Sequence, residues 1–81
     1  MNVRVLYFAS LREKVKASES VESLAAGASV ADLWSKLCEK HDAIVPMSAS
    51  ISFAVNREYA GRDTVLREGD EVALIPPVSG G

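Results

Sequence analysis

The chain has 81 residues, of which 48% are hydrophobic, and its formal net charge is −2 at pH 7. This length supports one compact domain, because two separate cores would each bury too little apolar surface. The composition is that of an ordinary globular domain and indicates neither a disordered chain nor a membrane protein. Eleven acidic residues against nine Lys and Arg leave no basic surface for nucleic acid.

The chain has one cysteine, Cys38, and one histidine, His41. One cysteine rules out an internal disulfide, and the two residues together are too few soft ligands for a zinc site. We interpret Cys38 as a small core residue and His41 as a residue at the end of a helix. Because the first residues lack the charged-then-apolar pattern of a signal peptide, we expect a cytoplasmic protein without membrane contact.

The first predicted strand covers residues 2–9, where β-branched and aromatic residues predominate. Alternation along a strand places three apolar side chains on one face, namely Val3, Val5 and Tyr7. The charged Arg4 marks the opposite face as the outer one. Leu6 and Phe8 are therefore predicted to be outward-facing apolar residues.

The next segments predict a short connection, a second strand and the start of a helix. Residues 10–16 suit a turn or a brief helix, and residues 19–24 alternate well enough for a strand. Ser29, followed three residues later by Asp32, resembles a capping box in which aspartate replaces the usual glutamate. A helix is therefore expected to begin at Val30.

Apolar residues then recur at intervals of three and four, which makes one continuous stripe on a helix. The stripe consists of Val30, Leu33, Trp34, Leu37 and Cys38. Lys40 and His41 suit the carbonyl end of a helix dipole, and Pro46 follows in what we expect to be a loop. The helix is thus predicted to end near His41.

The last third of the chain predicts three strands and two turns. Residues 51–55 form a strand, residues 56–58 a turn and residues 59–60 a short returning strand. Gly69-Asp70 predicts a turn in which glycine takes a positive φ. The apolar run within residues 71–76 predicts a strand buried in the middle of the sheet.

One long helix and four or five strands bury their apolar surfaces most economically when the helix stripe packs on one face of a sheet. We therefore predict an α+β fold of the β-grasp, ubiquitin-like class, with a mixed sheet. No second helix covers the other sheet face in this prediction. Phe8, Tyr59 and Ile75 are expected there, and an exposed apolar patch usually marks a partner surface.

The chain ends in two prolines, two spacer residues and two glycines: Pro76, Pro77, Val78, Ser79, Gly80 and Gly81. The prolines favour an extended chain that leads away from the domain. We predict a domain over residues 1–76 and an extended, flexible tail over residues 77–81. Five residues reach at most roughly 16–18 Å, which suits insertion into a pocket of another protein.

The two glycines also make chemical sense, because residues without Cβ pass through a narrow channel and leave the last carbonyl open to attack. A free carboxylate is a poor electrophile, and with a pKa of about 3.3–3.7 it is ionised at neutral pH. The carboxyl group of Gly81 must therefore be activated first, most simply by adenylation with ATP.

Four segments carry a resemblance to a known family: Phe8-Ala9-x-x-Arg12-Glu13, Val55-Asn56, Leu66-x-x-Gly69-Asp70-Glu71-Val72-Ala73, and the ending Pro-Pro-Val-Ser-Gly-Gly. Together they resemble the small subunit of molybdopterin synthase, the MoaD type of the ubiquitin-like sulfur carriers (MoaD/ThiS). The match runs in order through nearly the whole chain, although residues 18–50 match only in pattern.

The resemblance implies that a MoeB-like adenylyltransferase uses ATP transiently to adenylate Gly81, and that a sulfurtransferase supplies the sulfur of a thiocarboxylate. It also implies docking on a MoaE-like large subunit in a heterotetramer, where a pyranopterin precursor receives the sulfur. The catalytic side chains belong to that partner, so the chain is not an enzyme on its own. By the same resemblance, partner contacts fall on Phe8, Arg12, Tyr59 and Ile75.

Other functions also fit the tail. It suits a sulfur carrier for another product, such as the thiamine thiazole or a thiolated tRNA, and a ubiquitin-like tag joined to lysines. A protein-binding module with an inert tail is a further alternative. The proline pair and the Phe-Ala-x-x-Arg-Glu segment favour the molybdopterin carrier, because ThiS-like chains are typically shorter and lack the prolines.

Overall fold

A computed structural model describes residues 1–77, which form one five-stranded sheet packed against a helix. The strands are β1 (Asn2–Tyr7), β2 (Glu19–Ser23), β3 (Ser52–Val55), β4 (Glu58–Ala60) and β5 (Glu71–Ile75). The helices are α1 (Ser10–Val15), α2 (Val30–Lys40) and the 3-10 helix η1 (Asp42–Met47). The predicted α+β architecture is thus confirmed.

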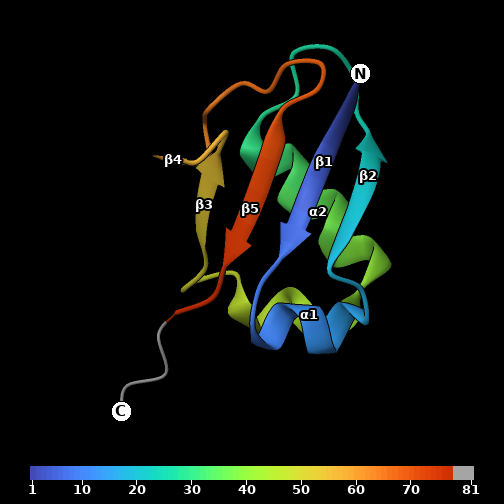
Figure 1. Ribbon diagram of the computed structural model, residues 1–81, viewed down its shortest axis with the longest axis vertical. Coiled ribbons are helices and arrows are strands. Elements are labelled where there is room, and N and C mark those ends of the chain that lie inside the picture. The colour runs from blue at the N-terminus through green and yellow to red at the C-terminus, as the bar shows by residue number, and fades with distance from the viewer. Residues whose placement is uncertain (78–81) are drawn as a thin grey trace.

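The sheet has the strand order β2-β1-β5-β3-β4, so β5 occupies the middle, as predicted. β1 and β5 run parallel, and the other neighbouring strands are antiparallel. α2 lies behind the sheet in Figure 1, and among residues 1–77 no helix covers the face turned to the viewer. α1 lies across the end of the sheet where β1 and β5 finish.

The sheet face toward α2 carries the core, and β1 shows the predicted alternation. Its three inward side chains expose no more than 2% of their surface, and β5 adds two that are fully buried: Val3, Val5, Tyr7, Val72 and Leu74. Burying each such aliphatic side chain stabilises the fold by about 1.5–3 kcal/mol. The outward position of Phe8 is also confirmed, since 45% of its surface is exposed.

α2 begins at Val30, as predicted, because a complete capping box precedes it. The N–H of Asp32 donates to Ser29 Oγ at 3.2 Å, and the N–H of Ser29 donates to Asp32 Oδ2 at 2.9 Å. These two bonds satisfy donors that a helix start otherwise leaves unpaired. The helix ends at Lys40, with His41 as its C-cap.

The predicted stripe of α2 is confirmed, with a small correction at Cys38. Four of its residues are buried: Val30, Leu33, Trp34 and Leu37. Cys38 is half-buried at the edge of the core, where its Sγ lies 4.0 Å from Ser48 Oγ. Trp34 packs edge-on against Phe53 and donates its indole N–H to Ser48 Oγ at 2.9 Å.

The prediction of a loop around Pro46 is wrong, because this residue lies inside η1. Ile44 anchors η1 in the core with no exposed surface. Ser48 closes its end by donating its hydroxyl to the Val45 carbonyl at 2.7 Å.

The hairpin between β3 and β4 is tighter than predicted. Asn56 and Arg57 alone form the turn, with φ values of 51° and 71°, and Glu58 already belongs to β4. Two consecutive residues with positive φ define a type I′ turn, whose twist matches that of the flanking strands. The predicted positive φ of Gly69 is confirmed at 83°.

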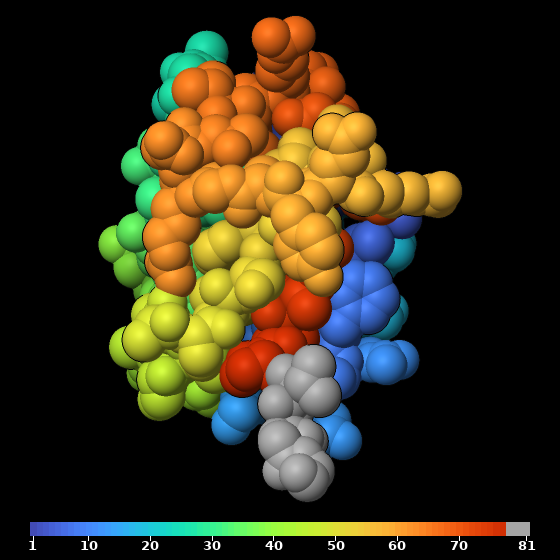
Figure 2. All heavy atoms as spheres, turned by 90° about the vertical axis from the view of Figure 1, so that its left-hand side faces the viewer, coloured from blue at the N-terminus to red at the C-terminus, as the bar shows by residue number. Residues whose placement is uncertain are grey.

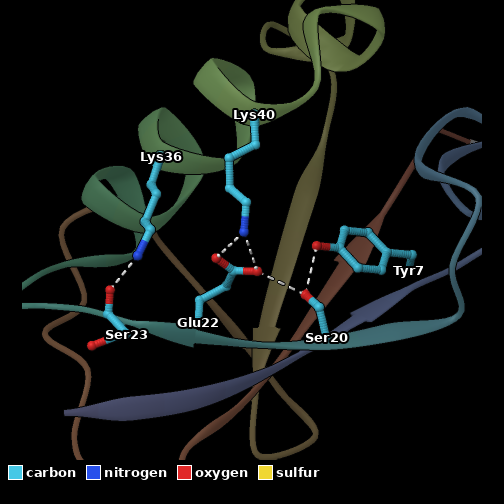
Figure 3. A network of polar contacts seen from close by, with 6 residues as sticks. All are labelled: Tyr7, Ser20, Glu22, Ser23, Lys36 and Lys40. Atoms are coloured by element: carbon cyan, nitrogen blue, oxygen red, sulfur yellow. Dashed lines mark hydrogen bonds and ion pairs between the residues drawn. The ribbon is translucent and has the colours of Figure 1, made fainter.

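β2 turns an acid toward the core and an apolar residue toward solvent. Glu22 is 2% exposed, whereas Val21 is 66% exposed. Lys40 reaches down from α2 and donates to both carboxylate oxygens of Glu22, at 2.9 and 3.2 Å (Figure 3). The buried charge therefore has its counter-ion at the seam between the helix and the sheet.

A chain of two hydrogen-bonded hydroxyl groups also ends on the carboxylate of Glu22. Ser20 donates to Glu22 Oε2 at 3.0 Å and lies 2.8 Å from the hydroxyl of Tyr7 (Figure 3). Because the hydrogen of Ser20 is used on Glu22, Tyr7 donates to Ser20. Burial, and to a smaller extent the negative charge of Glu22, raise the pKa of Tyr7 above its ordinary value of 10.0. Tyr7 is thus a neutral donor at physiological pH.

Candidate functional site

The predicted chemical group lies outside the described residues, which end at Pro77. This applies to four predicted tail residues: Val78, Ser79, Gly80 and Gly81. Pro76 is half-buried and Pro77 exposed, directly after β5. The structure therefore places the base of the tail, and the predicted division between residues 1–76 and 77–81 stays a prediction.

β5 ends where its ladder with β3 ends. Ile75 pairs with Ser52 in the last step of the antiparallel register. Pro76 has no N–H to donate, so it does not extend the ladder further. The tail consequently starts from the central strand of the sheet.

Two of the predicted partner residues meet at this point. Tyr7 pairs with Leu74 in the last step of the parallel register of β1 and β5, and Phe8 and Ile75 are the residues that directly follow them. Both follow inward-facing residues and therefore share the outer face. In Figure 2 the end of β5, in red, lies between the blue atoms of β1 and the yellow atoms of residues near 50–60.

Tyr59 lies farther along the same face, on the edge strand β4. It pairs with Ala54, and 80% of its surface is exposed. Ala54 pairs with Ala73, which in turn pairs with Leu6, so one row of apolar residues crosses four strands. We call the exposed part of this face the outer patch; it consists of Leu6, Phe8, Tyr59, Ala73 and Ile75, whereas Ala54 is 7% exposed.

Arg12 is not part of this sheet face. It lies exposed on α1, next to Leu11, whose side chain is fully buried and anchors the helix. Among residues 1–77 the Arg12 guanidinium forms no ion pair. The structure therefore brings Phe8, Tyr59 and Ile75 onto one surface and leaves Arg12 beside it, at the end of the sheet.

A charged row borders the outer patch. Arg4 lies between Glu19 and Glu71, at 3.2 and 3.4 Å, and links β2, β1 and β5. Such exposed pairs contribute about 0–1 kcal/mol each, so the row marks a polar rim more than a source of stability. Val21, which pairs with Arg4, is a further exposed apolar residue there. Sequence reasoning did not single out Val21, because the alternation of β2 does not reveal which face is inward.

Two of the segments that resemble the family join in space. The amide of Asn56 donates to Asp70 Oδ1 at 2.9 Å, and its oxygen accepts the N–H of Glu71 at 3.0 Å. Asp70 in turn accepts the N–H of Arg67 at 2.8 Å. These bonds tie the β3–β4 hairpin to the start of β5 and hold Tyr59 in its place on the edge of the sheet.

Two shallow hollows of the described surface lie against β4. They measure about 260 Å³ and 520 Å³ and share three lining residues, Tyr59, Ala60 and Gly61. Among residues 1–77 no three His, Cys, Asp or Glu side chains are grouped to hold a metal ion. No helix of that part of the chain is long and apolar enough to cross a bilayer.

Relatives of similar length match this chain over nearly all of its residues. The molybdopterin synthase sulfur carrier subunit of Chlamydomonas reinhardtii is 40% identical over 83 residues, and the match covers both chains completely. The human protein of the same name is 35% identical, over 98% of this chain and 93% of its own.

Solved structures confirm the fold. SAMP1 of Haloferax volcanii superposes with a TM-score of 0.90 over both full chains at 28% identity. Subunit 1 of a molybdopterin converting factor from Pyrococcus furiosus has a TM-score of 0.88 at 31% identity, over 96% of this chain and 99% of its own. Subunit 1 of the Helicobacter pylori factor, solved with subunit 2, shares the fold with a TM-score of 0.71 at 22% identity, over both full chains. Residues 5–81 match the ThiS family, so the chain belongs to that family.

Proposed function

We propose that this chain is the sulfur carrier subunit of a molybdopterin synthase and that the carboxyl group of Gly81 carries the sulfur. The observation that carries the proposal is the full-length similarity, at 35–40% identity, to proteins named as that subunit. These relatives make the chain a carrier within a sulfurtransferase complex, not its catalytic subunit. The choice of Gly81 rests on the Gly-Gly ending and on the chemistry of a free carboxyl group.

The chemistry proceeds in three balanced steps. The Gly81 carboxylate attacks the α-phosphate of ATP, which forms an acyl-adenylate and releases pyrophosphate. A sulfide equivalent from a sulfurtransferase then displaces AMP and leaves a thiocarboxylate. In the last step that sulfur attacks a carbon of the pyranopterin precursor and displaces an oxygen substituent from it. Water then hydrolyses the bond between the acyl carbon and the sulfur, which restores the Gly81 carboxylate and leaves the sulfur on the pterin. ATP is consumed in each cycle and is not a resident cofactor.

The proposed partners are a MoaE-like large subunit, a MoeB-like adenylyltransferase and a sulfurtransferase. A large subunit that receives the tail must also contact the surface from which the tail starts, and that surface is the outer patch. Aromatic anchors such as Phe8 and Tyr59 are typical of partner surfaces. We propose a heterotetramer of two large and two small subunits, in the cytoplasm.

The test is the intact mass of the chain after incubation with ATP, a MoeB-like adenylyltransferase and a sulfide source. We expect the mass gain of one oxygen exchanged for one sulfur, confined to the C-terminal peptide. Omitting ATP should abolish the gain. The Chlamydomonas relative serves as the positive control, and an unchanged mass beside a modified relative would refute the proposal.

A second function is supported by the match to SAMP1, since a further solved structure carries the name small archaeal modifier protein 1. The same acyl-adenylate transferred to a lysine amine would make the chain a protein modifier. Lysine-linked conjugates in cells that express a tagged chain would support this function. If the chain is recovered only as carboxylate and thiocarboxylate, the carrier function alone stands.

A further inference from the structure

Ala9, at the turn between β1 and α1, has a backbone conformation that alanine rarely adopts. Its φ is 49° and its ψ is −124°, a region where the Cβ of an L-residue crowds the backbone and that glycine occupies easily. The N–H of Leu11 donates to the Phe8 carbonyl at 3.0 Å and closes the turn. Ala9 thus takes the first central position of a turn that resembles type II′, where glycine is preferred.

The strained turn persists because the core fixes both of its sides. Tyr7, two residues earlier, is 2% exposed, and its N–H donates to the Ser18 carbonyl at 2.9 Å. Leu11, two residues later, has no exposed surface. Three residues between two fixed points have few alternative paths, so the surroundings impose the conformation on Ala9.

The turn determines the directions of two exposed side chains that flank it. Phe8 precedes Ala9 and directly follows Tyr7, which pairs with Leu74 one residue before Ile75. Arg12 follows in α1, and its N–H donates to the Ala9 carbonyl at 3.1 Å. Rotation of the peptide groups around Ala9 would therefore move Phe8 and Arg12 relative to the end of β5.

We propose that Ala9 is a positioning residue for sulfur transfer, whose strained turn orders Phe8 and Arg12 before a partner binds. The inference rests on the proposed function. Ordering in advance strengthens binding because less side-chain and loop freedom is lost on association. Glycine would remove the strain at Ala9 but would also allow the turn to adopt other conformations.

Three altered chains distinguish the effect of backbone strain at Ala9 from the effect of conformational order in the turn. Ala9→Gly removes the steric cost and loosens the turn. A synthetic chain with D-alanine at position 9 removes the cost but keeps the methyl group, because a D-residue favours positive φ. Lys16→Gly is the matched control, since Lys16 caps the other end of α1 with a φ of 64° and lies away from Phe8.

We expect all three chains to melt at or above the temperature of the parent. Ala9→Gly should bind the large subunit about 3- to 10-fold more weakly, the factor expected for freeing one ordered side chain. Its KM as sulfur carrier should rise in proportion, with kcat unchanged because Gly81 is untouched. The D-alanine chain and Lys16→Gly should bind like the parent in calorimetry.

If Ala9→Gly bound the large subunit as tightly as the parent, the positioning role would be wrong. If the D-alanine chain melted at a lower temperature than the parent, the backbone of Ala9 would not be strained. An equal loss of affinity in Lys16→Gly would show that α1 acts only as a structural unit. The parent chain distinguishes a failure of the positioning role of Ala9 from a failure of the proposed function. If it neither binds the large subunit nor transfers sulfur, the proposed function itself fails, and the positioning role fails with it.

Discussion

Phe8 and Ile75 are the residues through which the outer patch reaches the base of the tail. We predict that Phe8→Glu or Ile75→Glu weakens binding to the large subunit by about 2 kcal/mol or more, since a charge would lose its hydration against an apolar contact. The fold should unfold as cooperatively as the parent, because both side chains lie outside the core. Calorimetry of binding and thermal unfolding measure the two effects separately.

Val65→Glu provides the matched control for this prediction. Val65 is also apolar and 57% exposed, but it lies on the loop that bridges to Ser29, before α2. It should leave binding unchanged. Equal weakening by all three substitutions would indicate a general effect of added negative charge, and parental binding of Phe8→Glu would remove this residue from the contact surface.

Lys40 is the counter-ion of a carboxylate that the fold has almost removed from water. We predict that Lys40→Met lowers the free energy of unfolding by about 1–3 kcal/mol, because the buried Glu22 loses its charged donor. Lys36→Met, one turn earlier, removes only a bond to the carbonyl of Ser23 and should cost clearly less. Denaturant unfolding compares the two, and equal losses would show that the charge of Glu22 is solvated in another way.

α2 is the element that the sequence predicted best, and its packing can be tested directly. Leu37→Ala should destabilise the fold by about 2–5 kcal/mol, because it removes a fully buried side chain and leaves a cavity. Ser35→Ala, on the exposed side of the same helix, should change stability by no more than about 0.5 kcal/mol. If the two substitutions had similar effects in chemical unfolding, the stripe would not be the main contact with the sheet.

An element could be predicted from the sequence where several local patterns indicated the same structure. The capping box and the 3,4 spacing of α2 both report local geometry, so the residues alone located its start and its buried face. β2 differs, because the counter-ion of the buried Glu22 is a lysine that lies 18 residues away in sequence. η1 was not predicted, because its one fully buried residue, Ile44, does not produce a periodic pattern of apolar residues. The strain at Ala9 left no sequence signal, since alanine is common in every setting.

The whole molecule places the start of the tail at the centre of a rigid sheet. β5 is bonded on both sides, to β1 and β3, and the hydrogen bonds of Asn56 secure its beginning. A partner that grips the outer patch therefore holds the base of the tail at a fixed position. The predicted role of the four terminal residues follows from the family and from carboxyl chemistry, and it stays a prediction until tested on the chain itself.

The chain length beyond that base is the quantity on which sulfur transfer should depend. Docking uses the sheet surface and the stem of the tail, whereas the chemistry needs one carbonyl carbon at one depth. A change of one residue moves that carbon by roughly 3.3–3.6 Å, which destroys the geometry required for attack. Gly81→Ala should be less harmful, because it keeps the depth and adds only a methyl group.

The most direct measurement compares the parent chain with two others, one lacking Gly81 and one extended by a single residue, in a purified, protease-free molybdopterin assay. Adenylation, binding to the large subunit and product formation are followed separately, and melting temperatures confirm that all three chains fold equally. We predict that both altered chains bind almost like the parent and yield no molybdopterin. Product formation at the parental rate by either of them would contradict the assignment of Gly81 as the residue that carries sulfur.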